Sequence, residues 1–324
     1  MEYKPKNFIT PEKTKHHAEI LSNRVKNRFR HLSKRFKREG IDCFRLYDWD
    51  IPEVRAVVDW YAEHIVVAEY ERLQTGPNWL PQMAQAVAQV LNIPPERVHT
   101  KRRRTASEGK TRYGKLDTKD KRFEVHERDL RFWINLDDFL DTGLYSDHRD
   151  TRVIIKKLAQ GKDFLNLFAY TGAFTCAAAA GRAKSSVTVD RSATYVKWAQ
   201  DNLKLNGLSG PQHTFIQSDV GKYLELAYRQ KRQFNLIFVD PPSFSKDVSQ
   251  GAAFDINRDH PALIQSVLKV TSPGAAVFFS TNHQRFEPRF LDLKVRDITE
   301  LTPKTIPEDY RNKKIHRCWQ ITAL

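Results

Sequence analysis

The sequence has little cysteine and no long apolar run. Its 324 residues include three cysteines, Cys43, Cys176 and Cys318, which are scattered and form no C-x-x-C or Cys/His pattern. We therefore expect neither a disulfide framework nor a metal site. No segment approaches the ~20 apolar residues of a membrane-spanning helix, and residues 1–10 lack the apolar core of a secretory signal. These absences predict a globular, cytoplasmic protein without a membrane partner.

Acidic residues are scarce relative to basic ones. Lysine and arginine total 54, against 39 aspartate and glutamate residues, which gives a net charge of +15 and a pI near 9.7. Such a charge attracts polyanions and adds salt-sensitive affinity for nucleic acid. The basic residues are concentrated in five segments, namely 24–38, 101–104, 110–112, 119–122 and 311–317.

Glycine is missing where a dinucleotide-binding turn needs it. Residues 163–172, DFLNLFAYTG, lead directly into AFTCAAAA, a pattern typical of strand, tight turn and helix in a parallel α/β sheet. The pyrophosphate fingerprint G-x-G-x-x-G needs three glycines, whereas Gly172 stands alone. We infer a nucleoside ligand without phosphates, such as S-adenosylmethionine (SAM), and expect Gly172 to let the backbone approach it.

Three later apolar runs end in aspartate. SSVTVD ends in Asp190, 18 residues past Gly172, while HTFIQSD ends in Asp219 and FNLIFVD ends in Asp240. An acid near this offset binds ribose hydroxyls in nucleotide-binding α/β folds. Each aspartate has an alternative role as a helix N-cap. The series of three, followed by DPPSF, favours a ligand site.

The chain contains five longer motifs, which are TGLYSDHR (142–149), NLFAYTG (166–172), VTVDRS (187–192), NLKLNGL (202–208) and DPPSFS (240–245). Together they resemble those of class I SAM-dependent ribosomal RNA methyltransferases, in particular the C-terminal, guanine-N7-methylating half of a fused bacterial enzyme that modifies 23S ribosomal RNA twice. The resemblance extends from about residue 23 onward. The N-terminal half of the fused enzyme is absent, so we expect either a free-standing homologue or a piece of a longer protein.

This resemblance implies a Rossmann-like methyltransferase sheet with SAM as cofactor. The cofactor-binding residues it implies, together with those inferred above, are Asp147, Arg149, Asn166, Phe168, Thr171, Gly172, Asp190, Ser192 and Asp219. Asp147 and Arg149 would reach the methionine end of SAM, with a helix cap as the alternative for Asp147. The partner would be 23S ribosomal RNA or a large-subunit precursor.

The DPPSF segment is the candidate catalytic turn. Pro241 and Pro242 would stiffen the strand exit, Asp240 would accept hydrogen bonds from a base edge, and Phe244 would stack on an unstacked base. Cytosine-C5 enzymes need a cysteine nucleophile. In the closest cytosine-modifying relatives of this family, that cysteine follows the strand corresponding to AAVFFST. Here that place reads NHQRF, with His283 and no cysteine. We therefore favour guanine N7 in 23S ribosomal RNA, with an exocyclic amine, or a non-catalytic RNA-binding assembly factor, as alternatives.

The expected fold is α/β, with three segments. Residues 1–40 would form a mobile arm up to residue 20 and then a basic amphipathic helix, whose apolar stripe packs onto the protein and whose basic face points to RNA. Residues 41–140 would form a small α+β RNA-binding subdomain with the order strand-strand-helix-strand-strand, and residues 141–324 the SAM-binding domain, ending in an antiparallel edge hairpin. The expected RNA-binding residues are Lys101, Arg102, Arg103, Arg104 and Arg112.

Overall fold

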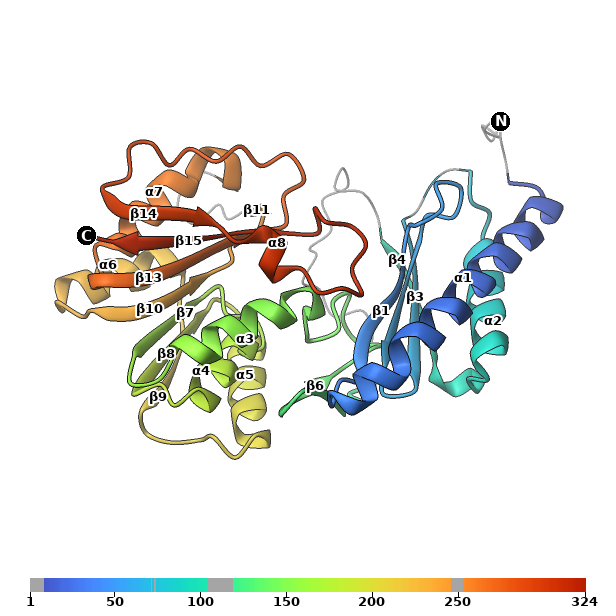
Figure 1. Cartoon of the computed structure of the whole chain (residues 1–324), viewed down its shortest axis with the longest axis horizontal. Coiled ribbons are helices and arrows are strands. Elements are labelled where there is room, and N and C mark those ends of the chain that lie inside the picture. Colours follow the sequence, from blue (N-terminus) through green and yellow to red (C-terminus); the bar gives the residue numbers. More distant parts are fainter. Residues whose placement is uncertain (1–8, 71, 73, 104–118, 246–252) are drawn as a thin grey trace. The chain divides into compact units, whose positions relative to one another are not determined.

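The computed structural model describes residues 9–70, 72, 74–103, 119–245 and 253–324 (Figure 1). The chain divides into two compact units. Unit 1 contains the residues through Ser146 together with Glu308–Arg311, and unit 2 contains the remainder. The boundary therefore lies six residues after the expected one, and the chain returns once to unit 1 near its C-terminal end. Among the described helices, none combines the length and apolar character that crossing a bilayer requires.

Unit 1 is a four-stranded sheet covered by two helices, with a separate hairpin (Figure 1). The strand order is β1-β2-β3-β4, and only the β3–β4 pair is parallel. The elements are α1 (Pro11–Arg38), β1 (Cys43–Asp48), β2 (Ala56–Tyr61), β3 (His64–Tyr70), α2 (Trp79–Leu91), β4 (Val98–Arg103), β5 (Phe123–Glu127) and β6 (Leu130–Ile134).

Helix α1 begins earlier than expected, so the prediction of a mobile arm over residues 11–20 was wrong. Thr10 caps the helix by accepting a hydrogen bond from the Lys13 N–H at 3.3 Å, and Pro11 occupies the first turn, where its missing N–H costs nothing. Further along, His17 is buried and accepts a hydrogen bond from the Trp79 indole at 3.2 Å. The helix therefore starts at a Thr-Pro signal that the apolar periodicity did not reveal.

The apolar stripe of α1 packs onto the protein, as expected. Leu21, Val25, Leu32 and Phe36 are buried in one core with residues of α2 and the sheet, while Phe29 is partly buried at its edge. Helix α1 is thus part of unit 1 rather than a separate segment.

Two expected single strands are hairpins. The run from Ala56 to Tyr70 turns back at Ala62 and Glu63, which have positive φ values of 44° and 68°. Two residues of positive φ match the right-handed twist of the flanking strands. Residues 123–134 likewise turn at Arg128, with φ 60°, to give β5 and β6. Neither turn contains the glycine or asparagine that usually marks such a hairpin, so neither hairpin could be recognised from the sequence.

Unit 2 is a seven-stranded sheet with helices on both faces (Figure 1). Its main elements are α3 (Arg149–Leu158), β7 (Asp163–Leu167), α4 (Ala173–Ala180), β8 (Ser185–Asp190), α5 (Ala193–Leu205), β9 (His213–Gln217), α6 (Val220–Arg229), β10 (Phe234–Val239), α7 (Ile256–Leu268), β13 (Thr271–Thr281), β14 (Val295–Glu300), α8 (Thr302–Thr305) and β15 (Arg317–Ala323).

The strand order is β14-β15-β13-β10-β7-β8-β9. β14 and β15 pair antiparallel, as expected, and β15 is also antiparallel to β13. Since β14 opposes β15, it runs in the same direction as β13, and β15 alone runs against the other strands of this sheet. This strand order, with one antiparallel strand near the edge, is the arrangement that the resemblance implied.

The core of unit 2 has two layers, because the central parallel strands are buried on both faces. On one face α3 and α4 pack against Phe164 and Phe238, and on the other α6 and α7 pack against Leu165 and Val239. This packing fixes the strand ends from which the functional residues project.

Candidate active site

The parallel strands of unit 2 end at one edge of the sheet. β10, β7, β8 and β9 are adjacent and parallel, so the residues that follow them share this edge. Asp190 ends β8, and Asp240 comes directly after β10. Asp219 follows β9 and caps α6, where its carboxylate accepts a hydrogen bond from the Lys222 N–H at 3.1 Å. Of the three aspartates, Asp219 is thus the one that takes the alternative N-cap role.

The turn between β7 and α4 has an unusual backbone. Phe168, Tyr170 and Gly172 have positive φ values of 55°, 50° and 73°. For phenylalanine and tyrosine this conformation costs on the order of 1–3 kcal/mol each, and such strain is concentrated at functional sites. The Asp190 carboxylate helps to hold the turn by accepting a hydrogen bond from the Tyr170 N–H at 2.9 Å.

Gly172 makes room for helix α5. A Cβ at this position would lie 2.5 Å from the Cβ of Ala199, and the positive φ also favours glycine. Helix α5 is tied to the same turn by the Asn202 side-chain amide, which donates to the Thr171 carbonyl at 2.9 Å. Close packing of helix α5 is thus a reason for glycine at this position that the sequence did not reveal. Contact of this turn with a cofactor stays a prediction.

Asp190 is fixed by main-chain groups. Its two carboxylate oxygens accept hydrogen bonds from the N–H groups of Tyr170 and Ser192, both at 2.9 Å. Burial raises the pKa of Asp190, while these hydrogen bonds act in the opposite direction. The main-chain N–H of Arg191 also bonds to this carboxylate, so its orientation is fixed while acceptor capacity remains for a ligand hydroxyl. Ser192 itself caps α5 through a hydrogen bond from the Tyr195 N–H at 3.3 Å.

Asn166 lies inside unit 2. It is 1% exposed and donates to the Thr175 hydroxyl at 3.0 Å, which in turn lies 2.7 Å from the Thr188 hydroxyl. These bonds join β7, α4 and β8 below the turn. The structure gives Asn166 a bracing position, and its contact with a cofactor stays a prediction.

The turn after β10 combines two prolines with an exposed aromatic ring. Pro241 is buried and Pro242 is partly buried, so the backbone leaving the strand is both stiff and packed. Phe244 is 52% exposed and opens the short strand β11 (Phe244–Ser245), which pairs with β12 (Phe254–Asp255). Phe244 lies four residues after Asp240, whose side chain is 27% exposed. A carboxylate and an exposed aromatic ring are groups that can bind an unstacked base through hydrogen bonds and stacking.

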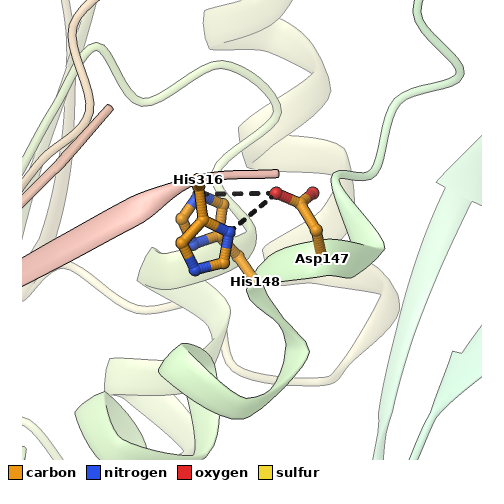
Figure 2. Close-up of side chains that lie close together, drawn as sticks. All are labelled: Asp147, His148 and His316. Atoms are coloured by element: carbon orange, nitrogen blue, oxygen red, sulfur yellow. Dashed lines mark hydrogen bonds and ion pairs between the residues drawn. The ribbon is translucent and has the colours of Figure 1, made fainter. Parts of the chain in front are cut away.

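Asp147, His148 and His316 form a compact polar cluster (Figure 2). The Asp147 carboxylate lies 2.9 Å from Nδ1 of His316 and 4.0 Å from Nε2 of His148. The two imidazole rings stack with centroids 4.1 Å apart and planes 14° apart. Asp147 and His148 come from the turn before α3, whereas His316 directly precedes β15. The cluster therefore joins segments that are far apart in the sequence.

The cluster extends to Asp240. Nε2 of His148 lies 3.7 Å from the Asp240 carboxylate, and the Ser280 hydroxyl forms hydrogen bonds with both groups. The pKa of Asp240 is raised to about 7, first by burial and then by the negative charge of Asp147, while His316 and Ser280 act in the opposite direction. Burial lowers the pKa of His148 well below its ordinary value. Near neutral pH, His148 is uncharged and Asp240 is close to its midpoint of ionisation.

The composition of the cluster raises the question of a metal. One ligand atom from each of Asp147, His148 and His316 lies within 4.8 Å of the others. However, all four ring nitrogens have hydrogen-bond partners, which are Thr151, Ser280, Asp147 and Thr305. The lone pair of an imidazole nitrogen lies in the ring plane, so two stacked rings do not direct their nitrogens at one point. We therefore interpret the cluster as a hydrogen-bonded network that shapes the surroundings of Asp240.

A family model described as S-adenosylmethionine-dependent methyltransferase matches residues 54–303. The chain belongs to this methyltransferase family.

Two curated relatives are similar over nearly the whole chain. Ribosomal RNA large subunit methyltransferase K of Neisseria meningitidis serogroup B is 41% identical over 323 residues, which cover 98% of this chain and 88% of the relative. Ribosomal RNA large subunit methyltransferase K/L of Syntrophotalea carbinolica is 43% identical over 312 residues, which cover 94% of this chain and 43% of the relative. The chain thus spans less than half the length of the K/L protein.

Solved structures show the same fold. A proposed methyltransferase in complex with SAH has a TM-score of 0.75 at 22% identity, covering 96% of this chain and 82% of that one. At this sequence identity, the structural similarity shows a shared fold and nothing about function.

The methyltransferase site fits its cofactor, SAM. The rigid Asp190 acceptors suit the ribose hydroxyls, and Asp219 and Asp240 lie at the ends of the neighbouring strands. The strained turn at Phe168 and Tyr170 is held in place at the same edge. Asp147 is engaged by His316, and Arg149 is 1% exposed at the start of α3. Their contact with the methionine end of SAM stays a prediction.

Lys101 is not a surface residue, so its expected contact with RNA phosphates is corrected. The side chain on β4 is 5% exposed, and its ammonium group donates to the carbonyls of Phe139 and Leu140 at 2.7 and 3.0 Å. Burial lowers its pKa to about 8. The alternation of a strand sends every second residue inward, and Lys101 lies on the inward side.

The other expected RNA-binding residues are only partly placed. Arg102 is exposed but pairs with Glu69 at 2.9 Å, and Arg103 is partly buried. Arg104 and Arg112 lie outside the described residues. The segment 101–104 is therefore a weaker candidate for RNA contact than its charge suggested.

Sequence reasoning missed the role of both histidines. His148 lies inside the TGLYSDHR motif, which carried the family resemblance, and His316 lies in the terminal segment IHRCWQIT. A lone histidine carries no periodic signal, and 168 positions separate the pair. They come together because β15, which His316 directly precedes, lies between β14 and β13 in the sheet.

Proposed function

We propose that this methyltransferase transfers a methyl group from SAM to N7 of a guanine in 23S ribosomal RNA. The curated relatives at 41–43% identity are named ribosomal RNA large subunit methyltransferases K and K/L. The net charge of +15 suits a polyanionic substrate, either free 23S ribosomal RNA or a large-subunit precursor in the cytoplasm.

The turn after β10 is the observation that carries this proposal. It presents a partly exposed carboxylate, Asp240, and a half-exposed ring, Phe244, on a backbone stiffened by two prolines. A guanine taken out of its stack would lie on the ring of Phe244, which offsets part of the unstacking cost at ~1–3 kcal/mol per base.

Guanine N7 needs no general base, because it already carries an in-plane lone pair. When bound, SAM supplies a sulfonium methyl group that an aligned nucleophile accepts by in-line displacement. The protein contributes positioning, which can remove ~7–11 kcal/mol of the barrier. The Asp240 carboxylate also stabilises the positive charge that grows on the ring, an interaction stronger in the transition state than in the bound substrate.

Covalent chemistry through cysteine has no support in this chain. All three cysteines are buried. Burial raises the pKa of Cys176 to about 12 and also raises that of Cys318, to which the charge of Asp240 contributes. A thiolate nucleophile, which cytosine-C5 methylation requires, is therefore disfavoured at each position.

An exocyclic amine of guanine or adenine is the second candidate target. One observation favours it, because a carboxylate with a pKa of about 7 can accept the proton that an alkylated amine releases.

The product decides between the two targets. RNA methylated by the purified protein with labelled SAM should yield 7-methylguanosine and should be cleaved at the modified site after borohydride and aniline treatment. Label on an exocyclic amine would contradict the N7 proposal and would give Asp240 the proton-accepting role.

A further inference from the structure

Seven of the basic residues of α1 form two sets with different surroundings. Arg24, Arg28 and Arg35 lie on one side of the helix and are bonded to other groups of unit 1. Their partners are Asp50, the Glu308 carbonyl, Glu39 and the Glu308 carboxylate. This set links α1 to other parts of unit 1.

The second set has no acidic partner among the described residues. Lys26, Arg30, Lys34 and Lys37 are spaced four, four and three residues apart, so they share one face of α1. None of them forms an ion pair within the described part of the chain. No acidic residue occurs between residues 20 and 38. This face therefore carries uncompensated positive charge.

Helix α2 lies beside α1 and differs from it in character. It contains no charged residue, and Gln82, Gln85, Gln89 and Asn92 form an exposed stripe of amide side chains along α2 and its C-cap. The two helices pack side by side on one face of the sheet (Figure 1). A cationic face and an amide stripe therefore lie on neighbouring helices of the same unit.

A groove lies between α1 and the C-terminal end of α2. Its volume is about 450 Å³, which is in the range of ~300–1,000 Å³ usual for ligand sites. Lys26 and Arg30 line the α1 side, Gln89 and Asn92 line the α2 side, and Phe29 contributes apolar surface between them. Phe29 is braced from behind by Trp60, with ring centroids 4.7 Å apart.

We propose that this groove binds one nucleotide of a single-stranded RNA segment, with its phosphate on Lys26 and Arg30 and its sugar and base edge against Gln89 and Asn92. The proposal rests on the RNA substrate of the proposed function and adds to it a contact surface in unit 1.

The two sides of the groove suit different parts of a nucleotide. Two cations one helical turn apart attract a phosphate, whereas the C-terminal end of α2 presents carbonyl groups and the negative end of the helix dipole, which repel one. Hydroxyl and amino donors are favoured at that end, and the amide side chains add both donors and acceptors. Because the 2′-hydroxyl is such a donor, the groove should prefer RNA to DNA.

The test compares two double variants with equal loss of charge. Lys26→Ala/Arg30→Ala removes the cationic side of the groove, while Lys13→Ala/Lys15→Ala removes two exposed lysines of the same helix away from it. Binding of a short fluorescein-labelled single-stranded RNA, and of DNA of the same sequence, is measured by anisotropy over a range of KCl concentrations. We expect the groove variant to lose ~10-fold in RNA affinity and to lower the salt slope by ~1.4, and the control to change little.

Equal losses in both double variants would overturn the proposal, because only overall charge would then matter. A Gln89→Ala/Asn92→Ala variant should reduce the preference for RNA over DNA, and an unchanged preference would also overturn the proposal. Single-turnover methyl transfer at saturating RNA separates a failure of the groove proposal from a failure of the proposed function. The Lys13→Ala/Lys15→Ala control should keep the wild-type rate there. Absence of any methylated product from the wild-type protein would refute the proposed function, whereas the comparison of RNA affinities would still decide for or against the groove.

Discussion

The turns after β8 and β10 place an aspartate at the same edge of one sheet, yet they surround it differently. Asp190 receives two main-chain N–H groups, whereas Asp240 faces a second carboxylate, Asp147, and a neutral imidazole. Burial raises the pKa of both, but that of Asp240 reaches about 7. A carboxylate held by fixed dipoles suits ligand binding, and one left near its midpoint of ionisation suits chemistry. The comparison is the basis for our proposal that SAM binds at the first turn and the reacting base at the second.

The largest effect is expected from Asp240→Asn. Turnover should fall by about 100-fold or more, because a transition-state charge loses its counter-charge, while SAM affinity stays near that of the wild type. Single-turnover methyl transfer and calorimetric SAM titration measure the two quantities. An equal loss of turnover and SAM affinity would remove the distinction between the two turns.

The same variant should be more stable than the wild type above about pH 7. The pKa of Asp240 is raised from 3.8 in the unfolded chain to about 7 in the folded one, so the folded state binds the proton more tightly. Stability from this group is present below about pH 4 and is lost as pH rises towards 7. Thermal unfolding at low and high pH should show that the advantage of the Asp240→Asn variant over the wild type grows with pH.

Asp190→Ala should weaken SAM binding by at least ~10-fold, since a carboxylate that accepts two hydroxyl hydrogen bonds contributes ~1.5–3 kcal/mol for each. Turnover at saturating SAM should remain measurable, which separates this variant from Asp240→Asn. Glu225→Ala, which removes an exposed carboxylate of α6 that pairs with Arg229, is the matched control. Unchanged SAM affinity in a folded Asp190→Ala protein would contradict the assignment of this turn.

Phe244→Ala should raise the KM for RNA by ~5–10-fold, through the loss of a stacking surface worth ~1–3 kcal/mol. The ring is half exposed, so folding should be little affected. Phe244→Tyr keeps the ring face and should behave as the wild type. If alanine and tyrosine variants have the same KM, the base does not stack at this position.

The smallest expected effect is a displacement of the pH profile. Turnover should rise with pH through about 7 as Asp240 ionises. Asp147→Asn should move this rise to lower pH, because the charge of Asp147 raises the pKa of Asp240, and His316→Gln should move it to higher pH. Shifts of up to ~1 pH unit in opposite directions are the signature, measured as kcat at saturating substrates. Shifts in the same direction would show that the network does not act through Asp240.

The sequence predicted the sheet of unit 2 well, because buried parallel strands and small-residue helices have strong local patterns. The aspartates at strand ends followed from the same patterns. What it could not predict depends on long-range contact or on atypical turns. Ala62 and Glu63 form a hairpin turn without glycine, Lys101 points inward, and His148 meets His316 only through the inserted strand. The burial of a single lysine does not change the hydrophobic periodicity of the sequence, and neither does a contact between residues 168 positions apart.

The return of Glu308–Arg311 to unit 1 affects how the protein is made. Asp309 accepts the Arg45 main-chain N–H at 2.9 Å, and Arg311 joins Arg24 on the carboxylate of Asp50. During translation, at ~5–20 residues per second, these partners emerge roughly ten to thirty seconds after Ser146 has been added. The Arg45 main-chain N–H therefore lacks Asp309, and the Asp50 carboxylate lacks Arg311, until almost all of unit 2 has been synthesised.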